Sequence, residues 1–313
     1  MVSEIVILPS CFSEKNISSE LIQVFKDIYN YPIFVYDFEN SNWINQIKTI
    51  DSNETVSDSL RKALQVFIKK IKHRIIINPS SQTDFSKIIN WLQEIKKYEN
   101  INCVFITNDD LTLCKKQKID FYQNIKDVIL ADSTKWDSIK INGLEIQKIE
   151  TKTEKILKMI AQNTDKVVLV DGYYNPNKKS FKTSLHLISR NLGQSNQYIK
   201  EDKKILIHAS KKMTNNIDLL KKHVEKELKY FKNQYNIKYE FYLWNYIDDR
   251  SFLTDKICLE STSGLEIIDE NSPGDNTNTK WIFLSHSIAE EQLYKYDISF
   301  DDDIDDIIWK YSI

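Results

Sequence analysis

The residues best suited to do chemistry follow a predicted strand over 239–244. Asp248, Arg250 and Asp255 lie in one short segment, and Ser263 comes soon after it. Arg250 is one of only four arginines among 43 basic residues. A guanidinium is a planar fork that binds phosphate or carboxylate through two parallel hydrogen bonds. The segment therefore predicts phosphate binding by Arg250, and the alternative is a structural ion pair between Arg250 and Asp248 or Asp255.

The spacing of this segment resembles the motif of phospholipase D-type phosphodiesterases, which is His-x-Lys-x4-Asp followed by a Gly-Ser step. Asp248 stands at the place of the histidine nucleophile and Arg250 at that of the lysine, while Asp255 keeps the aspartate register and Ser263 falls near the serine. The resemblance implies a degenerate phospholipase D-like (HKD superfamily) domain over 151–313. An acid at the nucleophile's place repels a phosphodiester, so the implied protein is a pseudoenzyme.

In the same family, two such sets meet across a pseudo-dyad or a dimer interface. The resemblance therefore implies that a two-fold neighbour in a homodimer would supply the second set. It also requires Asp248, Arg250 and Asp255 to converge at the edge of one sheet.

Two further candidates follow the predicted strand 204–208. His208 ends this strand, where side chains reach the carboxyl edge of a sheet, and Lys211 is a second candidate for phosphate binding. The alternative for His208 is a structural histidine with satisfied nitrogens. Asp171 ends the strand 166–170, as an aspartate does in inactive relatives of the superfamily, and the alternative is an Asx-type turn.

The first half resembles the latter part of a PIN-type nuclease. That family binds divalent metal with acids that follow successive parallel strands, and Asp109, Asp110 and Asp132 occupy comparable places. Oxygen ligands suit Mg²⁺ or Mn²⁺. The first strand ends without an acid, although Asp37 and Glu39 follow the second. The alternatives are a catalytic metal site and a metal-free Rossmann-like module in which Asp109 and Asp110 are turn and cap residues.

Apolar runs alternate with amphipathic segments of helical period, which predicts an α/β fold with mainly parallel or mixed sheets flanked by helices. We place one Rossmann-like, PIN-like domain at 1–150 and the phospholipase D-like domain at 151–313. The expected strands of the first domain are 5–8, 33–36, 74–77, 103–107 and 128–130, and its helices are 18–29, 60–71 and 85–98.

Composition excludes several classes of protein. The net charge is −2, so nucleic-acid binding would need a local basic patch. Five glycines form no phosphate loop, which disfavours a resident nucleotide cofactor. Four cysteines without metal-ligand spacing, and the lack of a signal peptide or a long apolar run, predict a cytoplasmic protein with no membrane partner.

The acidic tail over 301–306 ends in aromatic residues. One interpretation is a solvated helix start whose acids favour the helix dipole, with the aromatic end docked on the core. The other is a peptide that binds a basic partner or blocks the protein's own groove.

These observations favour a non-catalytic or weakly catalytic accessory protein that holds phosphate, nucleic acid or a protein partner in a microbial system of the antiviral-defence type. The alternative is an active metal-dependent or phospholipase D-type nuclease. A weaker alternative is a Rossmann-type transferase or nucleotide sensor.

Overall fold

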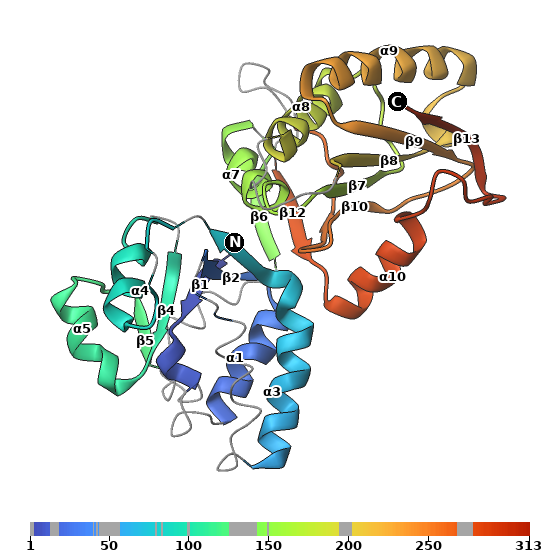
Figure 1. The fold of residues 1–313 in the computed structure, drawn as a ribbon. Helices are drawn as coiled ribbons and strands as arrows, with labels where there is room; N and C mark the ends of the chain where they lie inside the picture. The colour runs from blue at the N-terminus through green and yellow to red at the C-terminus, as the bar shows by residue number, and fades with distance from the viewer. Residues whose placement is uncertain are drawn as a thin grey trace. The chain divides into compact units, whose positions relative to one another are not determined.

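The computed structural model describes residues 3–12, 19–39, 41, 43, 57–78, 80–82, 84–98, 101–124, 143–148, 150–193, 202–267 and 278–313. The chain divides into two compact units, Met1–Ile141 and Asn142–Ile313, each with one sheet and flanking helices (Figure 1). The predicted α/β class is confirmed. The division falls before strand β6 (Gly143–Gln147), which pairs within the second sheet, a few residues before the boundary expected at 150.

The first unit contains a five-stranded parallel sheet in the order β3-β2-β1-β4-β5. The order reverses at β1, so right-handed connections place α1 and α3 on one face and α4 and α5 on the other (Figure 1). Its elements are β1 (Ser3–Ile7), α1 (Ser19–Asn30), β2 (Ile33–Phe38), α3 (Asp58–Ile71), β3 (Ile75–Asn78), α4 (Ile88–Ile95), β4 (Ile101–Ile106), α5 (Leu111–Lys116) and β5 (Tyr122–Asn124).

The second unit contains an eight-stranded mixed sheet in the order β13-β9-β8-β7-β10-β11-β12-β6. The three strands β7, β8 and β9 are parallel, and the others join antiparallel. Its other elements are α7 (Glu150–Ala161), β7 (Lys166–Asp171), α8 (Lys179–Gly193), β8 (Lys204–Ser210), α9 (Ile217–Tyr235), β9 (Lys238–Trp244), β10 (Arg250–Leu253), β11 (Leu259–Ser261), β12 (Asn278–Phe283), α10 (His286–Tyr296) and β13 (Ile307–Ser312).

The two faces of this sheet carry different helices: α7, α8 and α9 cover one face and α10 covers the other (Figure 1). Val168 and Val170 of β7 pack in one cluster with residues from α10, including Leu293. Successive side chains of a strand point to opposite faces, so Asp171 must project toward the α8 side. Ser251 of β10 bonds Gln292 of α10, which places its neighbour Arg250 on the α8 side as well.

Several predicted elements differ from the structure. The apolar sequence over 251–259 predicts one strand, but it forms two antiparallel strands, β10 and β11, because Thr254 Oγ1 accepts the backbone N–H groups of Lys256 and Ile257 and closes a turn. The sequence over 264–268 also predicts a strand, which is not formed in its described part. The predicted strand 128–130 and Asp132 lie outside the described residues.

The C-terminal segment also differs from its first interpretation: after the acidic residues the chain forms strand β13 and not a helix. This strand pairs antiparallel with β9 at the edge of the sheet, and Trp309 packs on Phe241 at 5.7 Å between ring centroids. The acids that precede it are largely exposed. Alternating aromatic side chains let the end of the chain extend the sheet, which overrides the helix expected from the acids.

All four cysteines are free and buried. Across the described residues, no helix combines the length and apolar character needed to cross a membrane.

Asp37 gives the first unit a pH-dependent stability. Its Oδ1 atom accepts hydrogen bonds from the Phe38 N–H and the Ser41 hydroxyl, and burial raises the pKa of Asp37 from 3.8 to about 6. The folded state holds this proton more tightly than the unfolded state, so the contribution of Asp37 to the free energy of unfolding falls as pH rises from 3.8 to about 6. The loss is at most about 3 kcal/mol.

We expect Asp37→Asn to remove this fall, because an amide oxygen can accept the same two bonds without a charge. The measurement is denaturant unfolding of the wild type and the variant between pH 4 and 7. An unchanged pH dependence in the variant would contradict the assignment.

Candidate functional site

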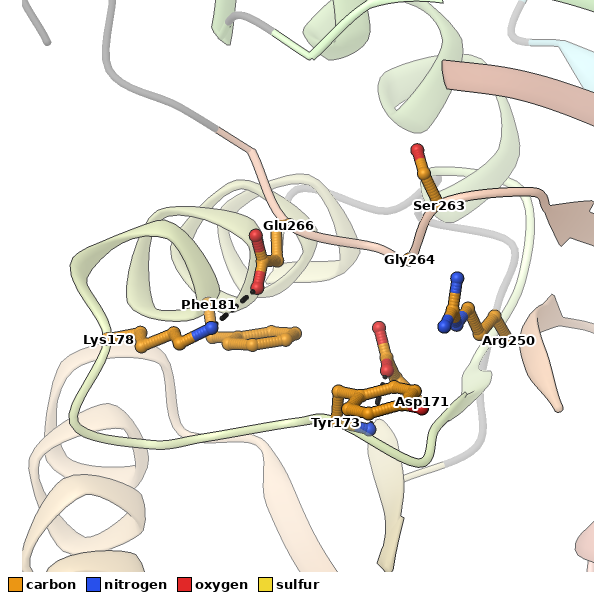
Figure 2. A pocket seen from close by; sticks show the side chains of 8 residues that line it. All are labelled: Asp171, Tyr173, Lys178, Phe181, Arg250, Ser263, Gly264 and Glu266. Carbon is orange, nitrogen blue, oxygen red and sulfur yellow. Dashed lines mark hydrogen bonds and ion pairs between the residues drawn. The ribbon is translucent and has the colours of Figure 1, made fainter. Parts of the chain in front are cut away.

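A cavity of about 230 Å³ lies at the carboxyl end of β7 in the second unit (Figure 2). Asp171, the last residue of β7, pairs with Arg250, the first residue of β10. Residues directly opposite each other in antiparallel strands project to the same face, so the acid and the guanidinium reach the cavity together. Phe181 of α8 and the turn containing Gly264 complete the wall.

Asp171 connects two walls of the cavity by hydrogen bonds. Its two carboxylate oxygens accept the backbone N–H groups of Tyr173 and Leu265, each at 2.9 Å. Burial raises the pKa of Asp171, while these bonds and the nearby Arg250 charge act in the opposite direction. Gly264 has φ +92°, and a Cβ atom there would lie 3.0 Å from Asp171 Oδ2. Glycine is therefore required where the turn approaches the carboxylate.

Arg250 forms no ion pair with Asp248 or Asp255, the two acids of the alternative interpretation, all three being described residues. Its guanidinium carbon lies 4.8 Å from the Tyr173 ring centroid, and Nη1 donates to the Thr262 carbonyl at 3.1 Å. This is the one hydrogen bond that Arg250 makes within the described part of the chain, so most of its five N–H donors are not committed. The guanidinium lies across from Asp171, with its end toward the cavity (Figure 2).

The two other acids of the motif lie apart. Asp248 forms an exposed ion pair with Lys212. Asp255 accepts a hydrogen bond from the Thr164 hydroxyl at 2.6 Å, and Thr164 precedes β7. Because Arg250 pairs with the last residue of β7, Asp255 is at the opposite end of the strand pair. The expected convergence of all three side chains is therefore wrong: Asp255 closes the turn after β10, far from the cavity.

Ser263 lines the cavity, but its hydroxyl is turned away from Asp171 and Arg250 (Figure 2). Its Oγ is buried without a hydrogen-bond partner among the described residues. Its carbonyl accepts a hydrogen bond from Lys148 Nζ at 2.6 Å. Ser263 therefore contributes the backbone of the turn rather than an activated nucleophile.

Lys148 was missed by the sequence reasoning. It is buried, and its burial lowers the pKa of its amine, while the charges of Glu266 and Asp171 act to raise it. One lysine in a lysine-rich chain carries no local signal. The structure alone shows that Lys148 supports the turn from a region before the predicted second domain.

His208 lies on the other face of the sheet. Its ring is fully buried, stacks on Tyr242 at 4.7 Å between centroids, and accepts a hydrogen bond from Trp244 Nε1 through Nδ1. Burial lowers the pKa of His208 to about 3, so the ring is neutral near pH 7. The burial and the Nδ1 bond fit the alternative of a structural histidine, but Nε2 has no hydrogen-bond partner among the described residues. Lys211 is exposed after β8 and does not line the cavity.

The acids of the first unit that were candidates for metal binding do not gather into one site, and Asp110 caps a turn. Asp110 accepts hydrogen bonds from Thr107 N, Thr107 Oγ1 and Ser10 Oγ at 2.9, 2.8 and 2.5 Å, and it closes a capping box after β4. Asp109 and Glu39 are exposed, and Asp37 lies within β2. In the described ranges, no group of three or more histidine, cysteine or acidic residues is placed to hold a metal.

The comparisons with known proteins name no family. No family model and no curated protein matches the chain. One solved structure that aligns with it is that of TrmBL2, an archaeal chromatin protein described as showing a novel mode of DNA binding. The alignment covers 81% of this chain and 79% of that one, at 12% identity and a TM-score of 0.29. A likeness this weak bears on neither fold nor function.

We expect His208→Ala to cost roughly 3 kcal/mol of unfolding free energy, because it leaves a void in the core and an unpaired Trp244 N–H. Urea unfolding of the variant measures this loss. A catalytic histidine would behave differently: its removal would abolish phosphodiester cleavage at unchanged stability.

Proposed function

We propose that the second unit binds a phosphate-bearing ligand at Arg250 without hydrolysing it. In this proposal the protein is a non-catalytic accessory or recognition component that acts beside a catalytic partner, in a microbial system of the antiviral-defence type. The observation that carries the proposal is an arginine that projects into a cavity, with donors left over and, within the described ranges, no carboxylate in an ion pair with it.

The size of the cavity supports a small ligand or one group of a larger ligand. Drug-sized molecules occupy pockets of roughly 300–1,000 Å³. At about 230 Å³, this cavity is smaller. A phosphate group fits such a space, and the rest of a larger ligand would remain at its mouth.

The charges around the cavity favour an anion by a small margin. Three cations, Lys148, Lys178 and Arg250, face two acids, Asp171 and Glu266. Lys178 and Glu266 neutralise each other at 3.2 Å. Asp171 is engaged by two backbone N–H groups, which offset part of its charge toward a bound anion. Arg250 is then the charge that a phosphate meets, and Lys148, bonded to the Ser263 carbonyl, adds a buried positive charge nearby.

The chemistry near Arg250 supports binding more than hydrolysis. No histidine is among the residues that line the cavity. The Ser263 hydroxyl has no base bonded to it among the described residues. Nucleophilic catalysis at a hydroxyl needs an adjacent base, so we assign no attacking group to this site. The phospholipase D-like spacing adds no support here, because Asp255 lies at the other end of the strand pair from Arg250.

We expect the full chain to bind inorganic phosphate or pyrophosphate in calorimetric titrations. Arg250→Ala should weaken this binding at least ten-fold, since a charge-assisted hydrogen bond contributes roughly 1.5–3 kcal/mol. Arg250→Lys should restore part of the affinity, because it keeps the charge and loses the fork. Arg190→Ala is the matched control: Arg190 pairs with Glu154 on α7, away from the cavity, and its loss should leave the affinity unchanged.

Two results would overturn the proposal. The first is phosphate binding that is absent, or equal in the wild type and Arg250→Ala. The second is cleavage of labelled DNA or RNA by the purified chain. Cleavage lost with EDTA and in Asp109→Ala would indicate a metal-dependent nuclease, whereas cleavage that resists EDTA and is lost in Arg250→Ala would indicate a phospholipase D-type nuclease.

A further inference from the structure

An exposed cluster of aromatic and charged side chains adjoins the cavity. We call it the tyrosine rim and define it as Tyr173, Tyr246, Lys212 and Asp248. The ammonium group of Lys212 lies 4.6 Å from the ring centroids of both tyrosines. Tyr173 is 44% exposed and Tyr246 is 64% exposed. Large aromatic residues left in solvent beside a cation form a surface suited to binding.

The rim is built on a tight backbone contact. Gly172 N lies 3.4 Å from the Asp249 carbonyl oxygen, and a Cβ atom on Gly172 would lie 2.3 Å from the Ile247 carbonyl oxygen. Only glycine lets the turn after β7 pack this closely against the loop after β9. The contact brings Tyr173 from the first segment next to Tyr246 from the second, so their positions do not depend on flexible loops alone.

The rim continues into the cavity through Tyr173. This residue lines the cavity, and its ring also lies 4.8 Å from the Arg250 guanidinium carbon. Cationic and aromatic groups therefore alternate from Tyr246 through Lys212 and Tyr173 to Arg250. Tyr246 is not among the residues that line the cavity. A ligand with a phosphate at Arg250 would reach Tyr246 only with another part of its structure.

This alternation matches one class of ligand. Single-stranded nucleic acid presents backbone phosphates and unpaired bases in turn, and proteins bind it by combining basic residues with aromatic rings on which bases stack. The bases of a duplex are stacked inside and cannot lie on an exposed ring. A protein partner would not require a phosphate-sized cavity beside the rings.

Asp248 limits this affinity. It holds Lys212 in an ion pair, and the hydrogen bond from Lys212 lowers the pKa of Asp248, which stays ionised. An approaching phosphate must compete with this carboxylate for Lys212. The acid that the motif places at position 248 thus restrains binding at the rim.

From these contacts we infer that the tyrosine rim binds single-stranded nucleic acid, with one base stacked on Tyr246 and a neighbouring backbone phosphate at Arg250. The inference rests on the proposed phosphate site and adds the ligand class. It also assigns Tyr246 and Asp248 opposite effects on affinity.

The test is fluorescence anisotropy of the full chain with a labelled oligothymidylate of about 12 nucleotides, within the range of known single-strand sites. Tyr246→Ala should weaken binding roughly ten-fold, whereas Tyr246→Phe should preserve it, because the stacking ring remains. Tyr294→Ala is the matched control, since Tyr294 is 92% exposed on α10 and should not contribute. Asp248→Asn should tighten binding severalfold, and added salt should weaken it.

Inorganic phosphate titrated into the same variants separates this inference from the proposed function. Tyr246→Ala should leave phosphate affinity unchanged, and Arg250→Ala should lose both ligands. The inference about the rim alone would be overturned if the chain bound phosphate but not the oligonucleotide. It would also be overturned if Tyr246→Ala left the oligonucleotide affinity unchanged. Equal affinity for duplex and single strand would also overturn it. A wild-type chain that does not bind phosphate would overturn the proposed function.

Discussion

The buried carboxylate of Asp171 is the junction on which the candidate site depends. It joins the end of β7 to the turn after β11 by accepting one backbone N–H from each. An ionised carboxylate is costly to bury, and here two N–H donors and a nearby guanidinium offset that cost. Without it, two buried N–H groups would lose their partners. The cavity wall and the conformation of Gly264 depend on this junction, and the pairing of β10 with β7 adds Arg250 opposite Asp171.

The sheet separates the second unit into two chemical environments. On the α10 side, His208 stacks on Tyr242 and packs edge to face with Tyr296 in a closed aromatic core. On the α8 side, Asp171 and Arg250 line the cavity. Strand alternation explains this separation, since neighbouring residues of one strand face opposite sides. A histidine at the end of a strand can thus be close to the site along the chain and still be separated from it by the sheet.

Acids that resemble catalytic or metal-binding groups in the sequence bind the chain's own hydrogen-bond donors in the structure. Asp110 caps the turn after β4, and Asp255 bonds Thr164. Asp110 accepts a backbone N–H at the end of β4, where backbone groups leave the sheet, and Asp255 accepts a side-chain hydroxyl next to the start of β7. Motif spacing alone does not distinguish such residues from ligands, because both roles place a carboxylate after a strand.

The α/β class and most strands and helices follow from the hydrophobic period, because that period is a local property of the chain. A rare residue type and a strand end also point to Arg250 and Asp171 in the sequence alone. Long-range folding is responsible for the strand pairing that sets Arg250 opposite Asp171, the burial of His208, and the contact of Lys148 with Ser263. It also turned the acidic tail into edge strand β13. These outcomes depend on contacts between residues distant in sequence and on the face of the sheet where each side chain lies. A local sequence pattern contains neither kind of information.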